Sequence, residues 1–297
     1  MTKIQSLIDN YLELCRCERR LSPHTLKAYA IDLRQFAIGM NAIRASTIRK
    51  RIAEIAQNRG FGPRTVRRKL ASIRAFLRAT RPDIALSAFR GRQMSVRIPL
   101  SLPRTVARRD LRKLFDVSAK SRQNSEDATT AICIRLMTAT GLRVSEVCAL
   151  KAGHINLETG EIRVAGKGSR ERVAIIPNKR LRYEVAEHLG ARSAGSDNIP
   201  LFENCRGQQL TPQCLRLRLH AVAKRAKLTT KITPHMLRHT AATLLLEEGV
   251  DTRFVQRLLG HASIATTQIY THVSSAALRS ILERADVLGT LGSDVSP

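Results

Sequence analysis

The chain of 297 residues contains no tryptophan, and aromatic residues make up only 4% of it. Its hydrophobic cores must therefore consist mainly of leucine, isoleucine, valine and alanine. No apolar run approaches the roughly 20 residues that a membrane-spanning helix needs, so we expect no membrane partner. The N-terminus has the pattern of an amphipathic helix and lacks that of a signal peptide.

Cysteine is scarce, and its spacing does not indicate a metal site. Cys15 and Cys17 are close in sequence, but no second Cys or His pair stands near them at zinc spacing. His235 and His239 are four residues apart, yet no glutamate follows His235 and no third ligand is evident. We therefore expect no metal, no cofactor, and reduced thiols in a cytoplasmic protein.

Acidic residues are few relative to basic ones. The chain has 51 Lys and Arg residues against 24 Asp and Glu residues, a formal net charge of +27 and an isoelectric point near 11.2. Residues 1–100 contain 21 basic and 6 acidic residues, so the excess is denser in this part of the chain. Such an excess is typical of a protein that binds nucleic acid.

The length suits two domains. A glycine and two prolines interrupt the periodic hydrophobic pattern between Arg90 and Thr105. We predict a helical core DNA-binding domain at 1–95, a linker at 96–105 and a catalytic domain at 106–297. The fold class expected is mainly α-helical, with a small β-sheet or hairpin in the second domain.

Basic side chains accompany two predicted helices of the first domain. Ser22 and Pro23 are typical of a helix start, and a second helix after Pro63 has an apolar stripe with arginines elsewhere on its surface. A run of charge is often only a solvated face, but in a chain this basic it favours contact with phosphates. The side chains predicted to contact DNA are Lys27, Arg64, Arg67, Arg68 and Arg74.

One helix of the last third has the features of an anion site. Thr233 can cap a helix that begins at Pro234, where a missing N–H costs nothing. His235 and Arg238 then share one face of the first turn. An anion is stabilised at this end of a helix, because backbone N–H groups there lack partners.

Further side chains with polar chemistry stand at predicted turns. Gly260 can end a short helix just before His261, and Tyr270 lies near the end of the next segment. Upstream, Arg143 follows a helix-terminating glycine and opens another helix that we expect to run through Val147 and Leu150. Glu146, one turn after Arg143, can orient its guanidinium.

Residues 161–177 alternate in the manner of two β-strands around Gly166, Lys167 and Gly168. The pattern predicts a hairpin with Lys167 at its tip. This glycine pair lacks the preceding spaced glycine of a Walker motif, so it does not indicate a nucleotide-binding loop.

These motifs, taken in order, resemble those of the tyrosine recombinases, the phage integrase and Xer-like group. A weaker match begins at Leu21, so the resemblance covers nearly the whole chain, although the Xer-like His-Pro ending is absent. The matching runs are TGLRVSE at 140–146, GKG at 166–168, PHMLRHT at 234–240 and LGHASIATTQIYTHV at 259–273.

The resemblance implies a mechanism for cutting DNA. Tyr270 attacks a phosphodiester, forms a 3′-phosphotyrosyl bond and releases a 5′-hydroxyl, while Lys167 protonates the leaving oxygen. One ester replaces another, so strands can be rejoined without ATP, and the cationic side chains make a metal unnecessary. The side chains expected to stabilise the negative charge are Arg143, Arg238, His235 and His261.

Recombination joins two duplexes through four strand exchanges, so we expect a homotetramer on double-stranded DNA with specific recombination sites. A related recombinase or an accessory protein as further partner is left open, as is the choice between dimer resolution and integration or excision of a mobile element. No arm-binding domain is evident ahead of residue 1, which favours a two-domain recombinase.

Two other functions are possible for a basic protein with these motifs. A type IB topoisomerase would use similar chemistry only to relax supercoils, and a helix-turn-helix regulator would have no use for Tyr270.

A last helix after Ser274 has an apolar stripe that could pack in its own domain or on a neighbouring protomer. The stripe consists of Leu278, Ile281, Leu282 and Leu288.

Overall fold

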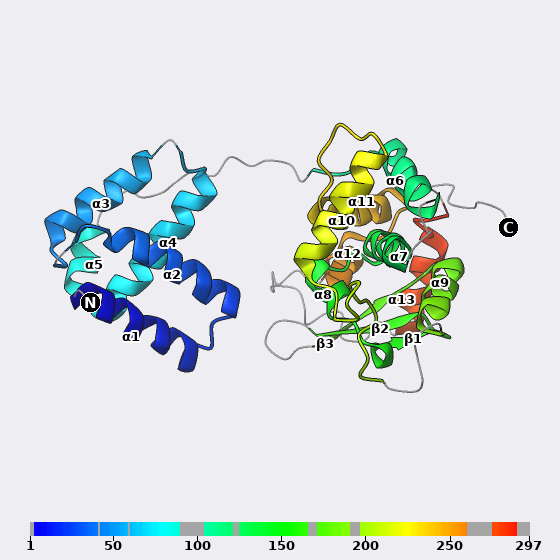
Figure 1. Ribbon diagram of the computed structural model, residues 1–297, viewed down its shortest axis with the longest axis horizontal. Helices are drawn as coiled ribbons and strands as arrows, with labels where there is room; N and C mark the ends of the chain where they lie inside the picture. Colours follow the sequence, from blue (N-terminus) through cyan, green and yellow to red (C-terminus); the bar gives the residue numbers. More distant parts are fainter. Residues whose placement is uncertain are drawn as a thin grey trace. The chain divides into compact units, whose positions relative to one another are not determined.

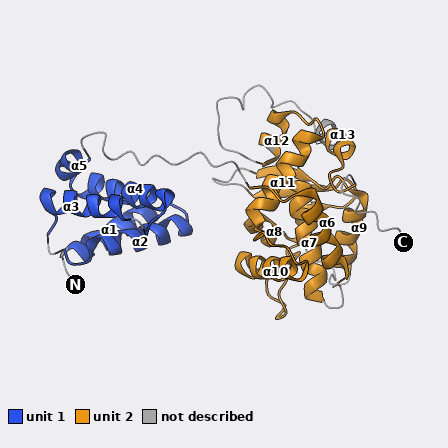
Figure 2. Cartoon of the chain, turned by 90° about the horizontal axis from the view of Figure 1, so that it is seen from above, with its two compact units in different colours: residues 1–101 blue, residues 102–297 orange. Residues whose placement is uncertain are grey.

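The computed structural model of the chain describes residues 3–40, 42–58, 60–89, 104–120, 125–165, 171–190, 197–259 and 275–289. The chain divides into two units, residues 1–101 and 102–297, which Figure 2 colours separately. The division falls within the interval predicted as a linker. Most of that interval lies outside the described residues, so the predicted linker boundaries stay a prediction. Within the described residues, no helix is both long and apolar enough to cross a membrane.

Unit 1 is helical (Figure 1). Helix α2 begins as predicted, because the Ser22 side chain accepts a hydrogen bond from the backbone N–H of Thr25. The core contains aliphatic side chains with few aromatic ones, and the Tyr11 and Phe76 rings meet edge to face at 5.4 Å. The helices are α1 (Lys3–Cys17), α2 (Pro23–Ala37), α3 (Ala45–Gln57), α4 (Pro63–Thr80) and α5 (Pro82–Ala88).

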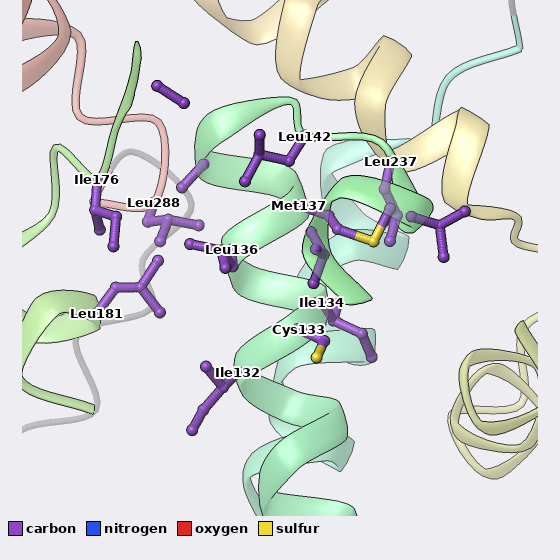
Figure 3. Close-up of a cluster of buried hydrophobic side chains, with 14 of the residues drawn as sticks. Ile132, Cys133, Ile134, Leu136, Met137, Leu142, Ile176, Leu181, Leu237 and Leu288 are labelled. Carbon is purple, nitrogen blue, oxygen red and sulfur yellow. The ribbon is translucent and has the colours of Figure 1, made fainter. Parts of the chain in front are cut away.

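Unit 2 surrounds one central helix, α7 (Ser125–Thr140), with the other helices and a small sheet (Figure 1). Residues 129–140 are all buried, which fits a helix that is covered on every side. Figure 3 shows Leu136 facing Ile176, Leu181 and Leu288 from other parts of the unit. The remaining helices are α6 (Arg108–Lys120), α8 (Val144–Cys148), the short 3-10 helix Ala152–His154, α9 (Lys179–Gly190), α10 (Pro212–Arg225), α11 (Pro234–Glu247), α12 (Thr252–Leu259) and α13 (Ser275–Ala285).

The sheet has three antiparallel strands in the order β1 (Ile155–Asn156), β2 (Glu161–Ala165) and β3 (Glu171–Ile175). Strands β2 and β3 confirm the predicted pair, with Val164 opposite Arg172 in the register. Residues 166–170, which join the two strands, lie outside the described residues. The fold class predicted from the sequence, mainly α-helical with a small sheet, is confirmed.

Helix α8 is shorter than predicted. It ends at Cys148 instead of continuing through Leu150. The Leu150 side chain is buried as expected, but its carbonyl oxygen accepts a hydrogen bond from the N–H of Leu201 at 2.8 Å. The Leu150 carbonyl is therefore bound by a residue distant in the sequence, a contact that local periodicity could not indicate.

Helix α13 packs on its own unit. Leu282 and Leu288 are buried in the core of unit 2. Arg182 binds Glu283 at 3.0 Å, and Asn178 donates a hydrogen bond to Asp286 at 3.1 Å. In this structure of the single chain the helix therefore packs within its own unit, which is one of the two alternatives left open by the sequence.

Candidate active site

Gly141 marks the place where three helices of unit 2 meet. It ends α7 with a φ of +64°, a left-handed conformation that glycine adopts without strain. A Cβ atom added here would stand 2.5 Å from a side-chain carbon of Leu259, at the end of α12. The Gly141 carbonyl oxygen accepts a hydrogen bond at 2.6 Å from Arg238, on α11. A side chain at this position would therefore strain the backbone and require the Leu259 side chain to move.

Arg143 and Glu146 form the contact that their spacing predicts. The backbone N–H of Arg143, just before α8, donates to Oε2 of Glu146 at 2.7 Å. The Arg143 guanidinium donates to Oε1 of the same carboxylate, also at 2.7 Å. The side chain of Arg143 is 41% exposed and that of Glu146 only 9%. The buried carboxylate thus closes the first turn of α8 and orients a partly exposed guanidinium.

Helix α11 begins as predicted and carries two of the expected site residues. The Thr233 side chain accepts a hydrogen bond from the N–H of Met236 at 3.3 Å, and Pro234 is the first helical residue. His235 is exposed in the first turn, whereas Arg238 is buried. Arg238 also donates to the carbonyl oxygen of Leu259. Its guanidinium therefore joins the ends of α7 and α12.

Arg172, on β3, belongs to the same cluster and was missed by the sequence analysis. One of its terminal nitrogens donates to Oε2 of Glu146 at 2.7 Å, and the other donates to the carbonyl oxygen of Leu258 at 2.9 Å. A signal was present in the sequence, because strand alternation places position 172 on the same side of the hairpin as Val164.

The cluster has an excess of positive charge. Three guanidinium groups, those of Arg143, Arg172 and Arg238, surround the single carboxylate of Glu146, with Arg238 4.0 Å from it. Burial, followed by the nearby charge of Arg143, lowers the pKa of Arg238 to about 10. Burial likewise lowers the pKa of Arg172. An anion bound here would relieve the repulsion between these cations, so the site favours a group such as phosphate.

His239 lies one turn after His235 on α11. Burial is the main cause that lowers the pKa of His239, and the neighbouring His235 and Arg238 lower it further. Across the part of the chain that the structure describes, no three His, Cys, Asp or Glu side chains are grouped as a metal ion would require.

Three of the predicted catalytic residues lie outside the described residues. Lys167 belongs to the connection between β2 and β3, His261 follows the end of α12 by two residues, and Tyr270 precedes α13 by five. The structure thus brings together Arg143, Glu146 and Arg238, with His235 on the same helix as Arg238.

Two known domain families match most of the chain. Residues 104–277 match the phage integrase family, and residues 8–81 match the phage integrase N-terminal SAM-like domain. The chain belongs to the phage integrase family. It is a tyrosine-type site-specific DNA recombinase, and the topoisomerase and regulator alternatives are not favoured.

Similar recombinases span nearly the whole chain. A tyrosine recombinase of Agathobacter rectalis is 35% identical, covering 95% of this chain and 96% of the relative. Tyrosine recombinase XerC of Thermodesulfovibrio yellowstonii is 34% identical, covering 97% and 98%. Tyrosine recombinase XerD of Listeria innocua is also 34% identical, covering 95% and 98%.

Solved structures share the fold of this recombinase. The Tn1549 transposon integrase, in complex with transposon right end DNA, gives a TM-score of 0.67 at 18% identity, covering 96% of this chain and 99% of that one. The XerH recombinase bound to its difH substrate gives 0.64 at 24% identity, covering 91% and 82%.

The basic residues predicted to contact DNA in unit 1 differ in their surroundings. Lys27 on α2 and Arg64 and Arg67 on α4 are exposed. Arg68 forms an ion pair with the buried Asp32, and the Arg74 guanidinium stands 4.7 Å from the centre of a neighbouring phenylalanine ring. Arg68 is exposed as well, so it is its pairing with Asp32 that distinguishes it from the first three.

The sequence analysis missed a buried ion pair in unit 1. Lys69 on α4 is buried, and its ammonium group lies 3.1 Å from the carboxylate of Asp32 on α2. Lys69 also donates to the Gln35 side chain. The position follows Val66 by three residues on a helix, so periodicity alone would have placed it near the apolar stripe.

Proposed function

We propose that this recombinase cuts DNA by attack of the Tyr270 hydroxyl oxygen on a phosphodiester held by Arg143 and Arg238. The bond from phosphorus to the 5′-oxygen breaks as the bond to tyrosine forms, which leaves a 3′-phosphotyrosyl ester and a free 5′-hydroxyl. Lys167 supplies the proton to the leaving oxygen. His235 and His261 assist by donating hydrogen bonds to the phosphate oxygens or by moving the tyrosine proton.

The observation that carries this proposal is the cationic cluster. The transition state of phosphoryl transfer develops negative charge on the non-bridging oxygens, and preorganised donors stabilise it. Arg143 is held by Glu146, and Arg238 is held by two backbone carbonyl groups. Both guanidinium groups are therefore fixed before a ligand binds, which limits the reorganisation needed during the reaction.

The partner that fits this chemistry is double-stranded DNA carrying specific recombination sites. The XerH and Tn1549 integrase structures are complexes with difH substrate and with transposon right end DNA. We propose that Lys27, Arg64, Arg67, Arg68 and Arg74 of unit 1 contribute to DNA contact, with Arg68 and Arg74 also serving the intramolecular contacts described above. A homotetramer is the assembly expected, because two duplexes present four strands for exchange. A cytoplasmic location would keep the six free thiols reduced.

The test is a nicked suicide substrate, on which a covalent complex accumulates and is resolved on a denaturing gel. Tyr270→Phe should retain site binding but form no adduct, because only the nucleophilic oxygen is removed. Tyr183→Phe provides a matched control, since Tyr183 is an exposed tyrosine on α9. A label at the 5′ end of the cut strand should stay with the protein, whereas a 3′ label should leave with the released fragment. An adduct that persists in Tyr270→Phe would show that another residue attacks the DNA.

A further inference from the structure

Arg172 is a charged residue on the inward face of strand β3. Its register partner Val164 is 3% exposed, and Ala174, two residues further along β3, is fully buried. Side chains two residues apart on a strand share a face, so an apolar residue would be expected at position 172. A charge in such a place is unfavourable unless it is paired. We therefore expect the charge of Arg172 to be paired with groups of the protein.

Both ends of the Arg172 guanidinium bind groups of the candidate active site. One terminal nitrogen donates to the carboxylate of Glu146, and the other donates to the Leu258 carbonyl. That carbonyl is among the last ones of α12, which have no partner within the helix. Arg238 binds the next carbonyl, that of Leu259. Two arginines thus hold successive carbonyls at the end of α12, two residues before His261.

We propose that Arg172 is a positioning residue for the recombination reaction, which holds Glu146 against Arg143 and fixes the end of α12. The inference rests on the proposed function, because it takes Arg143 as a group that binds the phosphate. Without Arg172, Oε2 of Glu146 loses a charged donor, and the carboxylate can rotate away from the Arg143 guanidinium. The Leu258 carbonyl would also lose its partner, so the end of α12 would be held less firmly.

Arg172 acts through these neighbours, because each of its terminal nitrogens binds a protein oxygen of the cluster. The guanidinium shape matters here, because the ammonium group of a lysine could reach one of these oxygens but could not bridge both.

The test compares Arg172→Ala with Arg163→Ala in the full-length protein. Arg163 is a matched control, since it lies on β2 with its side chain on the opposite face of the hairpin and donates to the Gly153 carbonyl at 2.8 Å. The rate of adduct formation on a nicked substrate and the affinity for a half-site are measured separately. Loss of the hydrogen-bond partner that orients a metal ligand typically costs about 10- to 100-fold in activity, and we expect a slowing of the same order for Arg172→Ala. The affinity for a half-site should change less than about threefold, because many phosphate contacts contribute to it.

A double variant separates positioning from a general structural role. If Arg172 acts through Glu146, adding Arg172→Ala to Glu146→Gln should slow adduct formation by less than about threefold more, because coupled groups are not additive. Full multiplication of the two effects, or an Arg172→Ala rate equal to that of Arg163→Ala, would overturn the proposal.

Should Arg172→Ala fail to fold, Arg172→Lys is measured in its place, and a wild-type rate in that variant would likewise overturn the proposal. An adduct in Tyr270→Phe would refute the proposed nucleophile, while the rate ratio of the Arg172 and Arg163 variants would still test this inference.

Discussion

Glu146→Gln tests the central claim that one buried carboxylate organises the arginine cluster. The carboxylate accepts hydrogen bonds from the backbone and guanidinium of Arg143 and from the guanidinium of Arg172, each at 2.7 Å. Glutamine keeps the size of the side chain and one acceptor oxygen. Its amide nitrogen, however, must face an N–H donor of Arg143 or Arg172, and the negative charge is lost.

The magnitude follows from the burial of these groups. Removing one partner of a buried ion pair costs about 3–5 kcal/mol, and a hydrogen bond to a charged group contributes about 1.5–3 kcal/mol. The lower end of the first range applies, because glutamine retains one acceptor and solvent screens the partly exposed Arg143. We therefore expect unit 2 to lose about 3 kcal/mol, which corresponds to a fall in Tm of roughly 6–12 °C for a domain of this size.

Thermal unfolding of the full chain, followed by calorimetry, measures this change. The chain has two units, so the transition of unit 1 serves as an internal reference and should not move. Glu158→Gln is the control substitution, because Glu158 is exposed in the turn before β2. A loss below about 1 kcal/mol, within the range of ordinary exposed ion pairs, would refute the view that Glu146 holds the cluster together.

Two further predictions concern the leaving group and the last helix. Lys167→Ala should slow cleavage of an ordinary 5′-oxygen much more than that of a 5′-bridging phosphorothiolate, whose sulfur leaves without protonation; equal slowing of both in single-turnover assays would indicate a positioning role. A chain ending at Val273 would expose the sites that bury Leu282 and Leu288, so at about 1.5–3 kcal/mol per buried leucine it should lose roughly 3–6 kcal/mol in a urea titration. Half-site and paired-site complexes should then weaken together in native gels, and a selective loss of the paired complex with unchanged unfolding would contradict packing within the protomer.

Local sequence signals predicted the parts of the site that depend on neighbours in the chain. Thr233 caps α11, and Gly141 ends α7 in the left-handed conformation. Glu146 lies three residues after Arg143 and binds it. Each of these features involves residues within about one helical turn of each other, so spacing and capping preference are sufficient to predict it.

The missed contacts all join residues that are far apart in the sequence. Arg172 binds a carboxylate 26 residues before it and a carbonyl 86 residues after it. Lys69 and Asp32 are 37 residues apart. In both cases a charge on an expected apolar face was the available signal, but periodicity identifies the anomaly without identifying the partner.

The geometry of Arg238 explains how one residue can serve the fold and the reaction together. Its hydrogen bonds to Gly141 and Leu259 fasten the C-terminal ends of α7 and α12, where the helix dipole favours a cation. These bonds use only part of the fork of N–H donors on a guanidinium, so the remaining donors can bind a phosphate oxygen. A lysine offers a single ammonium group and could not span two carbonyls and a phosphate at once. Preorganisation of the cationic cluster therefore depends on the same bonds that close the junction of the helices, and a variant that loosens this junction should weaken phosphate stabilisation even where it leaves every guanidinium in place.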